Sequence, residues 1–132
     1  MHTTATGSFE VNLQPQPPSD AAQAADLRRM AIDKTFAGDL IATSQGVMLS
    51  VMTDVEGSAG YVALECVTGT LHGRVGSFML QHSGQMDRGA QSLAINVVPD
   101  SATGDLVGLR GTMQIEIIDE QHTYRFEYKL PG

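Results

Sequence analysis

The sequence predicts an all-β fold, a single eight-stranded antiparallel β-barrel with at most one short helical turn. Apolar and polar residues alternate along most of the chain, as they do in strands with one buried face. The breaks between these runs are short, which suits antiparallel hairpins and leaves no room for crossover helices. Strands in such a meander must form a sandwich or close on themselves, because exposed edges promote aggregation. The sequential hairpins favour the barrel.

The first strand is expected over residues 8–13, where Phe9, Val11 and Leu13 alternate with polar residues. Residues 14–26 are expected to form a Pro/Ala-rich loop, because its prolines cannot donate to a β-ladder. These prolines are Pro15, Pro17 and Pro18. Ser19 can cap one helical turn near residues 19–26.

Seven further alternating runs complete the barrel, each bounded by a break rich in glycine or aspartate. They span residues 29–37, 40–53, 61–72, 75–86, 92–98, 112–118 and 123–130. A chain of 132 residues can bury a core without metal ions or disulfides. We therefore expect one domain over residues 1–132, with an interior that holds packed side chains or one small ligand.

Composition and charge exclude several function classes. Fifteen acidic and eight basic side chains give a net charge of −7, which disfavours nucleic acid and anionic membranes as partners. Cys66 is the only cysteine, so no internal disulfide forms, and the chain start lacks the pattern of a signal peptide. No run approaches the ~20 apolar residues of a membrane helix. We expect a soluble, cytoplasmic protein.

Glu65 and His82 are the residues around which chemistry can be organised. The run over residues 75–86 presents an apolar face that also carries His82. The break at Gly73-Arg74 predicts a two-residue type II′ turn, which needs glycine first, and this register places Glu65 directly opposite His82. Opposed side chains have Cβ atoms ~4.5–5.5 Å apart, so a carboxylate and an imidazole can share a hydrogen bond there.

Such a pair suits general acid–base chemistry, because burial and mutual attraction shift its proton equilibria in opposite directions. A buried pair that only satisfies its own hydrogen bonds is an equally good interpretation. A turn one residue longer would instead direct Glu65 to the outside of the barrel. Glu65 and His82 are therefore candidate catalytic residues or polar anchors.

The same inner face predicts apolar walls for a ligand cavity. Methionine fills irregular space and tolerates varied ligands, and aromatic rings can close a barrel interior. The candidate ligand-binding residues are Tyr61, Phe78, Met48, Met52, Met86, Tyr124 and Phe126. Plain core packing is the alternative for the methionines.

One strand is apolar on both faces, because Val47, Leu49 and Val51 alternate with Met48 and Met52. Its outer face needs a cover. A second copy of the chain is the favoured cover, which predicts a homodimer, and the Pro/Ala-rich segment is the alternative.

The sequence lacks the motifs of several common sites. The four histidines and Cys66 show no metal-ligand spacing, Ser83 lies in no nucleophile turn, and no glycine array precedes a helix. We expect no metal and no cofactor.

Four segments resemble a bacterial domain-of-unknown-function family. They are Asp33–Asp39, Gly60–Glu65, Gly69–Gly84 and Val98–Gly111. The resemblance covers most of the chain after Leu27 and includes Glu65, His82 and Gly84, with Ala102 in a turn where the family usually has glycine. It implies an eight-stranded barrel similar to that of allene oxide cyclase, a calycin-like architecture whose members bind or isomerise apolar small molecules. It implies no established activity.

Three functions are therefore compatible with the sequence. The first is a barrel that binds a small hydrophobic or amphipathic molecule, with Glu65 and His82 as polar anchors. The second is a cofactor-independent isomerase or cyclase in which the same two residues move protons. The third is a non-catalytic interaction protein with a solid barrel core.

Overall fold

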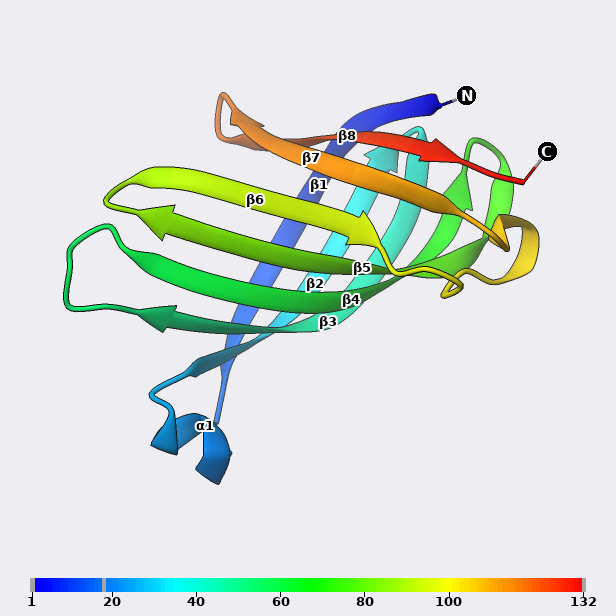
Figure 1. Ribbon diagram of the computed structural model, residues 1–132. Helices are drawn as coiled ribbons and strands as arrows, with labels where there is room; N and C mark the ends of the chain where they lie inside the picture. Colours follow the sequence, from blue (N-terminus) through cyan, green and yellow to red (C-terminus); the bar gives the residue numbers. More distant parts are fainter. Residues whose placement is uncertain (1, 18, 132) are drawn as a thin grey trace.

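The computed structural model describes residues 2–17 and 19–131 as a closed barrel of eight antiparallel strands, in which each strand pairs with its sequence neighbours and β8 pairs with β1 (Figure 1). The predicted fold class is confirmed. The strands are β1 (Thr3–Gln16), β2 (Arg28–Gly38), β3 (Leu40–Met52), β4 (Ala59–Leu71), β5 (Arg74–Asp87), β6 (Ala90–Val97), β7 (Arg110–Ile118) and β8 (Gln121–Lys129). Two short helices join them, α1 (Asp20–Ala24) and the 3-10 turn η1 (Gly104–Leu106).

β1 is longer than predicted and takes in the start of the expected loop, including Pro15. The β1–β8 ladder ends at Phe9, so Pro15 lies in the part of β1 that pairs only with β2. The missing N–H of Pro15 therefore removes no hydrogen bond to β8. The helical turn is present as α1, and its Ser19 cap accepts a hydrogen bond from the Ala22 amide at 3.2 Å. Pro18 lies outside the described residues.

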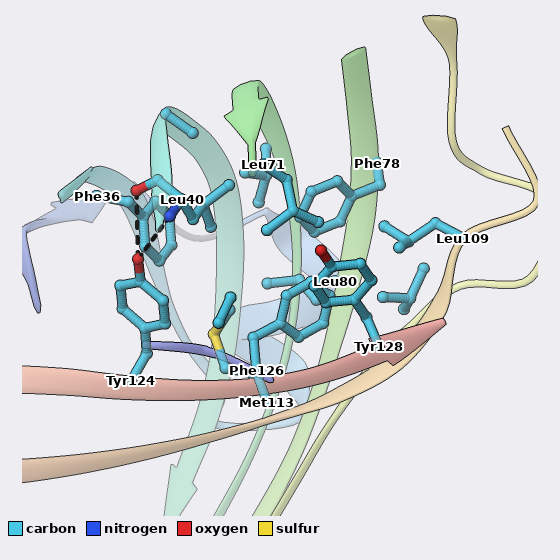
Figure 2. Packing of buried hydrophobic residues seen from close by; sticks show 14 of the residues in the cluster. Phe36, Leu40, Leu71, Phe78, Leu80, Leu109, Met113, Tyr124, Phe126 and Tyr128 are labelled. Atoms are coloured by element: carbon cyan, nitrogen blue, oxygen red, sulfur yellow. Dashed lines mark hydrogen bonds between the residues drawn. The ribbon is translucent and has the colours of Figure 1, made fainter. Parts of the chain in front are cut away.

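The hydrophobic core fills the end of the barrel where the β2–β3 and β4–β5 turns meet η1 (Figure 2). Aromatic rings stack there, with 5.7 Å between the ring centroids of Phe78 and Phe126. The connection between β6 and β7 closes this end, because Leu106 and Leu109 are each 1% exposed. This region is called the packed end below.

The β4–β5 hairpin differs from the predicted register. Its two-residue turn is His72-Gly73, with Leu71 paired to Arg74, and not Gly73-Arg74. Both turn residues have positive φ, 46° and 81°, as a type I′ turn requires. That turn matches the twist of the strands, and histidine tolerates the left-handed region better than most residues.

The changed turn shifts every pair between β4 and β5 by two residues. Glu65 lies opposite Leu80, and His82 lies opposite Ala63, so the predicted direct opposition of Glu65 and His82 is wrong. Because side chains alternate with a period of two, both residues still face the interior.

The sequence predicts an apolar outer face on β3, and the structure adds the neighbouring outer residues of β4 to it. Val47 pairs with Leu64, and Leu49 with Val62; Val47, Leu64 and Val62 are each about half exposed, at 49%, 50% and 52%. The homodimer that would cover this surface stays a prediction, which native mass spectrometry can test. Among the described helices, none has the length and apolar character needed to cross a membrane.

Candidate functional site

A buried ionic cluster surrounds Glu65 in the middle of the barrel. Its Oε1 accepts hydrogen bonds from Lys34 Nζ at 3.1 Å and is 3.0 Å from His82 Nε2, and its Oε2 accepts one from Ser44 Oγ at 2.9 Å. All four side chains are buried, and Glu65 has no exposed surface. We call Lys34, Ser44, Glu65 and His82 the Glu65 cluster.

Four adjacent strands, β2 to β5, each supply one member of the cluster. Lys34 and Ser44 are directly paired across β2 and β3, and Glu65 approaches Ser44 and His82 diagonally. Gly46 is the partner of Glu65 on β3, and a Cβ there would lie 2.2 Å from the Leu64 carbonyl oxygen. The glycine lets the two strands approach closely beside the carboxylate.

The surroundings favour the ionised form of Glu65. Burial alone would raise its pKa, but the hydrogen bond from His82 and the charge of Lys34 outweigh burial, so its pKa is lowered. Lys34 balances the carboxylate charge, and its ammonium also lies 5.0 Å from the ring centroid of Phe9. Glu65 is therefore an ionised anchor that accepts three hydrogen bonds.

This arrangement orients the His82 imidazole. An ionised carboxylate can only accept, so Nε2 carries a proton and donates it to Glu65. In the neutral ring Nδ1 then has a free lone pair, and no described residue hydrogen-bonds to it. The Tyr61 ring centroid lies 6.3 Å away, and burial and the Glu65 charge raise the pKa of the Tyr61 hydroxyl. Tyr61 is thus a neutral phenol beside an oriented base.

A pocket of about 310 Å³ lies at the end of the barrel opposite the packed end, which we call the open end. Its walls are mainly apolar and come from β3, β4, β5 and β6: Met48, Ser50, Val51, Met52, Ala59, Gly60, Tyr61, Gly84, Gln85, Met86, Gln91, Ser92 and Leu93. Tyr61 packs over Gly84, where a Cβ would lie 2.3 Å from its ring. His82 is the inward-facing residue that precedes Gly84 on β5, one step further into the barrel from this pocket and towards Glu65.

The structure divides the predicted wall residues between two places. Tyr61 and the methionines Met48, Met52 and Met86 line the pocket. Phe78, Tyr124 and Phe126 belong to the packed end, where each is at most 3% exposed. The Tyr124 hydroxyl bonds there to Leu40 and Ala37, so these three residues hold the barrel and do not line the pocket.

Lys34 and Ser44 are cluster members that the sequence analysis did not select. The signal for Lys34 is its position on the strand face that also carries Ile32 and Phe36, where a lysine interrupts an apolar row. Such a residue is rarely buried without a charge partner. Ser44 gave no comparable signal, because a small polar residue is common on a half-buried strand.

Fold and site together define a class of protein, a closed antiparallel barrel with a buried ionic cluster beside an apolar pocket. The chain belongs to the family described as protein of unknown function (DUF3224), whose model matches residues 5–128.

A similar solved structure is the crystal structure of a DUF3224-family protein with unknown function from Shewanella oneidensis MR-1. It is 50% identical in sequence, the alignment covers 100% of this chain and 99% of that one, and the TM-score is 0.93. A comparison with curated proteins gives no match.

Proposed function

We propose that the protein binds a small hydrophobic or amphipathic molecule in the pocket at the open end, with the Glu65 cluster as its polar anchor. The observation that carries this proposal is an apolar pocket in which one wall residue, Tyr61, has its ring centroid 6.3 Å from that of His82, an oriented histidine whose Nδ1 has no partner among the described residues. Ligand sites combine such apolar walls with a few placed polar groups.

The volume and the walls of the pocket support this proposal. Small-molecule pockets start at about 300 Å³, and this one measures about 310 Å³. Methionines adapt to ligands of different shape. The resemblance to allene-oxide-cyclase-like barrels, which enclose apolar molecules, points the same way. The pocket also argues against a barrel that is solid throughout, on which the interaction-protein alternative depends.

Fluorescence titration with the neutral apolar dye N-phenyl-1-naphthylamine tests the binding function. Ser50 faces the pocket, so Ser50→Phe fills it, and we expect dye affinity to fall about tenfold or more. Thr68→Phe places the same ring on the outer face of β4, where Thr68 is exposed, and should bind like the wild type. Equal dye binding by the wild type and Ser50→Phe would contradict the proposal.

A cofactor-independent isomerase or cyclase is the second candidate function. The fixed tautomer of His82 favours it, because a neutral imidazole with a free lone pair is a general base. In this mechanism His82 takes a proton from the bound molecule, Glu65 stabilises the resulting imidazolium, and the neutral Tyr61 hydroxyl is a candidate proton donor.

Metabolite comparison separates binder from enzyme. Cell extract is incubated with the wild type, with Glu65→Gln and with His82→Gln, and the products are compared by mass spectrometry. Turnover that is lost in both variants supports catalysis. A molecule retained by the wild type without any turnover supports a carrier.

A further inference from the structure

A second pocket lies at the packed end of the barrel and has a different character. It measures about 490 Å³, and its lining includes Arg74 at the start of β5 and Tyr128 and Lys129 at the end of β8. Thr3, His72, Leu130 and Pro131 complete the walls. Basic and hydroxyl groups therefore converge here, beside a small apolar surface.

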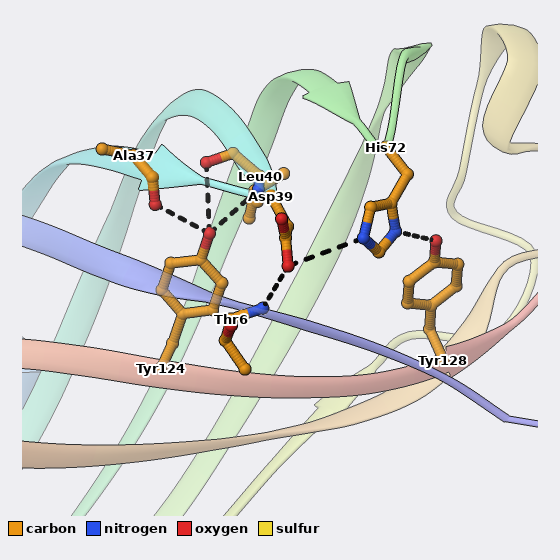
Figure 3. A network of polar contacts seen from close by, with 7 residues as sticks. All are labelled: Thr6, Ala37, Asp39, Leu40, His72, Tyr124 and Tyr128. Atoms are coloured by element: carbon orange, nitrogen blue, oxygen red, sulfur yellow. Dashed lines mark hydrogen bonds and ion pairs between the residues drawn. The ribbon is translucent and has the colours of Figure 1, made fainter.

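A chain of polar contacts ends at this pocket (Figure 3). The Tyr128 hydroxyl lies 2.5 Å from His72 Nδ1, and His72 Nε2 lies 3.6 Å from Asp39 Oδ2. Asp39 also accepts a hydrogen bond from the Thr6 amide at 2.9 Å. His72 and Tyr128 both line the pocket, and Asp39 lies behind His72.

Neither of the two cations that line this pocket, Arg74 and Lys129, has a carboxylate partner in the described part of the chain. Lys34, Arg88 and Arg125 each have a carboxylate within 4.0 Å, whereas the other five Lys and Arg residues have none among the described residues: Arg28, Arg29, Arg74, Arg110 and Lys129. Arg110 also lies directly opposite Lys129 across β7 and β8. Opposed like charges destabilise a strand pair. Arg74 and Lys129 thus bring two unpaired positive charges to this pocket, which an anion would stabilise.

We propose that this pocket binds the oxyanion of a small organic molecule, a carboxylate or a phosphate ester. Arg74 and Lys129 supply the charge, Arg74 can hold two oxygens of the anion at once, and the Tyr128 hydroxyl donates a hydrogen bond. Leu130 and Pro131 contact the apolar part of the molecule. The site is separate from the pocket at the open end and does not depend on the function proposed for that pocket.

The proton positions on His72 determine whether the Tyr128 hydroxyl can donate to the pocket. In neutral His72, a proton on Nε2 points to Asp39, so Nδ1 accepts the Tyr128 hydrogen and the hydroxyl has none to donate to the pocket. In protonated His72, Nδ1 donates to Tyr128, whose hydrogen turns to the ligand. A protonated imidazole also places a positive charge beside Arg74 and Lys129.

An NMR titration of the full chain tests the site with three probes. Benzoate and phenyl phosphate carry the two oxyanions, and benzyl alcohol is the uncharged control of similar size. We expect saturable shifts of the Arg74, Lys129 and Leu130 amides with at least one anion and none with benzyl alcohol. A response to only one of the two anions shows whether the site accepts a carboxylate or a phosphate ester.

Variants make the titration specific to this pocket. Arg74→Gln and Tyr128→Phe should each weaken anion binding about tenfold, and Arg88→Gln, which changes an exposed arginine elsewhere, should not. No saturation by either anion, or equal affinity in Arg74→Gln and the wild type, would overturn the proposal.

Discussion

The two ends of the barrel use the same alternation of side chains for opposite purposes. At the packed end the inward residues are large: Phe78 stacks on Phe126, and Phe36 packs edge-on against Tyr124 (Figure 2). At the open end glycine, serine and flexible methionine face inward and leave a pocket. The Glu65 cluster lies at the boundary. The strand pattern therefore fixes which side chains face inward, while their size decides whether the interior is solid or hollow.

Among the variants that probe the boundary between the two ends, removal of Glu65 should have the largest effect on the stability of the barrel. Glu65→Ala leaves Lys34 buried without its charge partner, which costs about 3–5 kcal/mol of the free energy of unfolding. Urea unfolding measures the loss, and Glu10→Ala on the exposed face of β1 is the control. A loss below about 1 kcal/mol would mean that the cluster does not stabilise the barrel. If the alanine variant does not fold, Glu65→Gln, which keeps the side-chain size, provides the measurement.

Two tyrosines give a smaller and more direct comparison of the ends. The Tyr124 hydroxyl accepts from the Leu40 amide at 2.9 Å and donates to the Ala37 carbonyl at 2.8 Å. Tyr124→Phe leaves these groups without a partner and should cost about 1–3 kcal/mol. Tyr61 at the open end has no such hydrogen bond among the described residues, so Tyr61→Phe should change stability by less than about 0.5 kcal/mol. Thermal unfolding of both variants measures the difference, and equal losses would contradict it.

The smallest expected effect is a change in the acid dependence of stability. Because the folded protein lowers the pKa of Glu65, its contribution is fully present above the usual carboxyl range and is lost as pH falls through the folded value. Between about pH 5 and about pH 3, wild-type stability should fall more steeply than that of Glu65→Gln, by at most about 1.4 kcal/mol per pH unit. Urea unfolding at several pH values measures both slopes. Parallel slopes would show that Glu65 has the same pKa in the folded and unfolded states.

Much of the fold could be predicted from the sequence because alternation with a period of two determines both the strands and their faces. The register of β4 and β5 could not, since a glycine at position 73 fits either a type I′ or a type II′ turn. The two turns differ by two residues in register, which changes each partner but keeps each face. Glu65 and His82 are therefore neighbours despite the wrong turn, joined diagonally at 3.0 Å.

The site was only partly predictable for a related reason. The alternation within one strand shows which residues face inward. It does not show where they lie along the barrel axis relative to residues of strands that are not its direct neighbours. The position along the barrel axis brings Lys34 beside Glu65. It also separates Met48 and Met86 in the pocket from Phe78 and Phe126 in the core. The stagger between strands accumulates around the barrel and leaves no local pattern in the sequence.

The boundary between β6 and β7 has a different role from the other strand boundaries. Within the described part of the chain these strands share one paired position, Asn96 with Thr112, whereas β4 and β5 are paired from Ala59 to Leu71 (Figure 1). Backbone amides along such an edge lack ladder partners and exchange with solvent hydrogen at low opening cost. The barrel is thus a continuous curved sheet with a seam, and local opening at that seam would expose the interior from the side without unfolding either end.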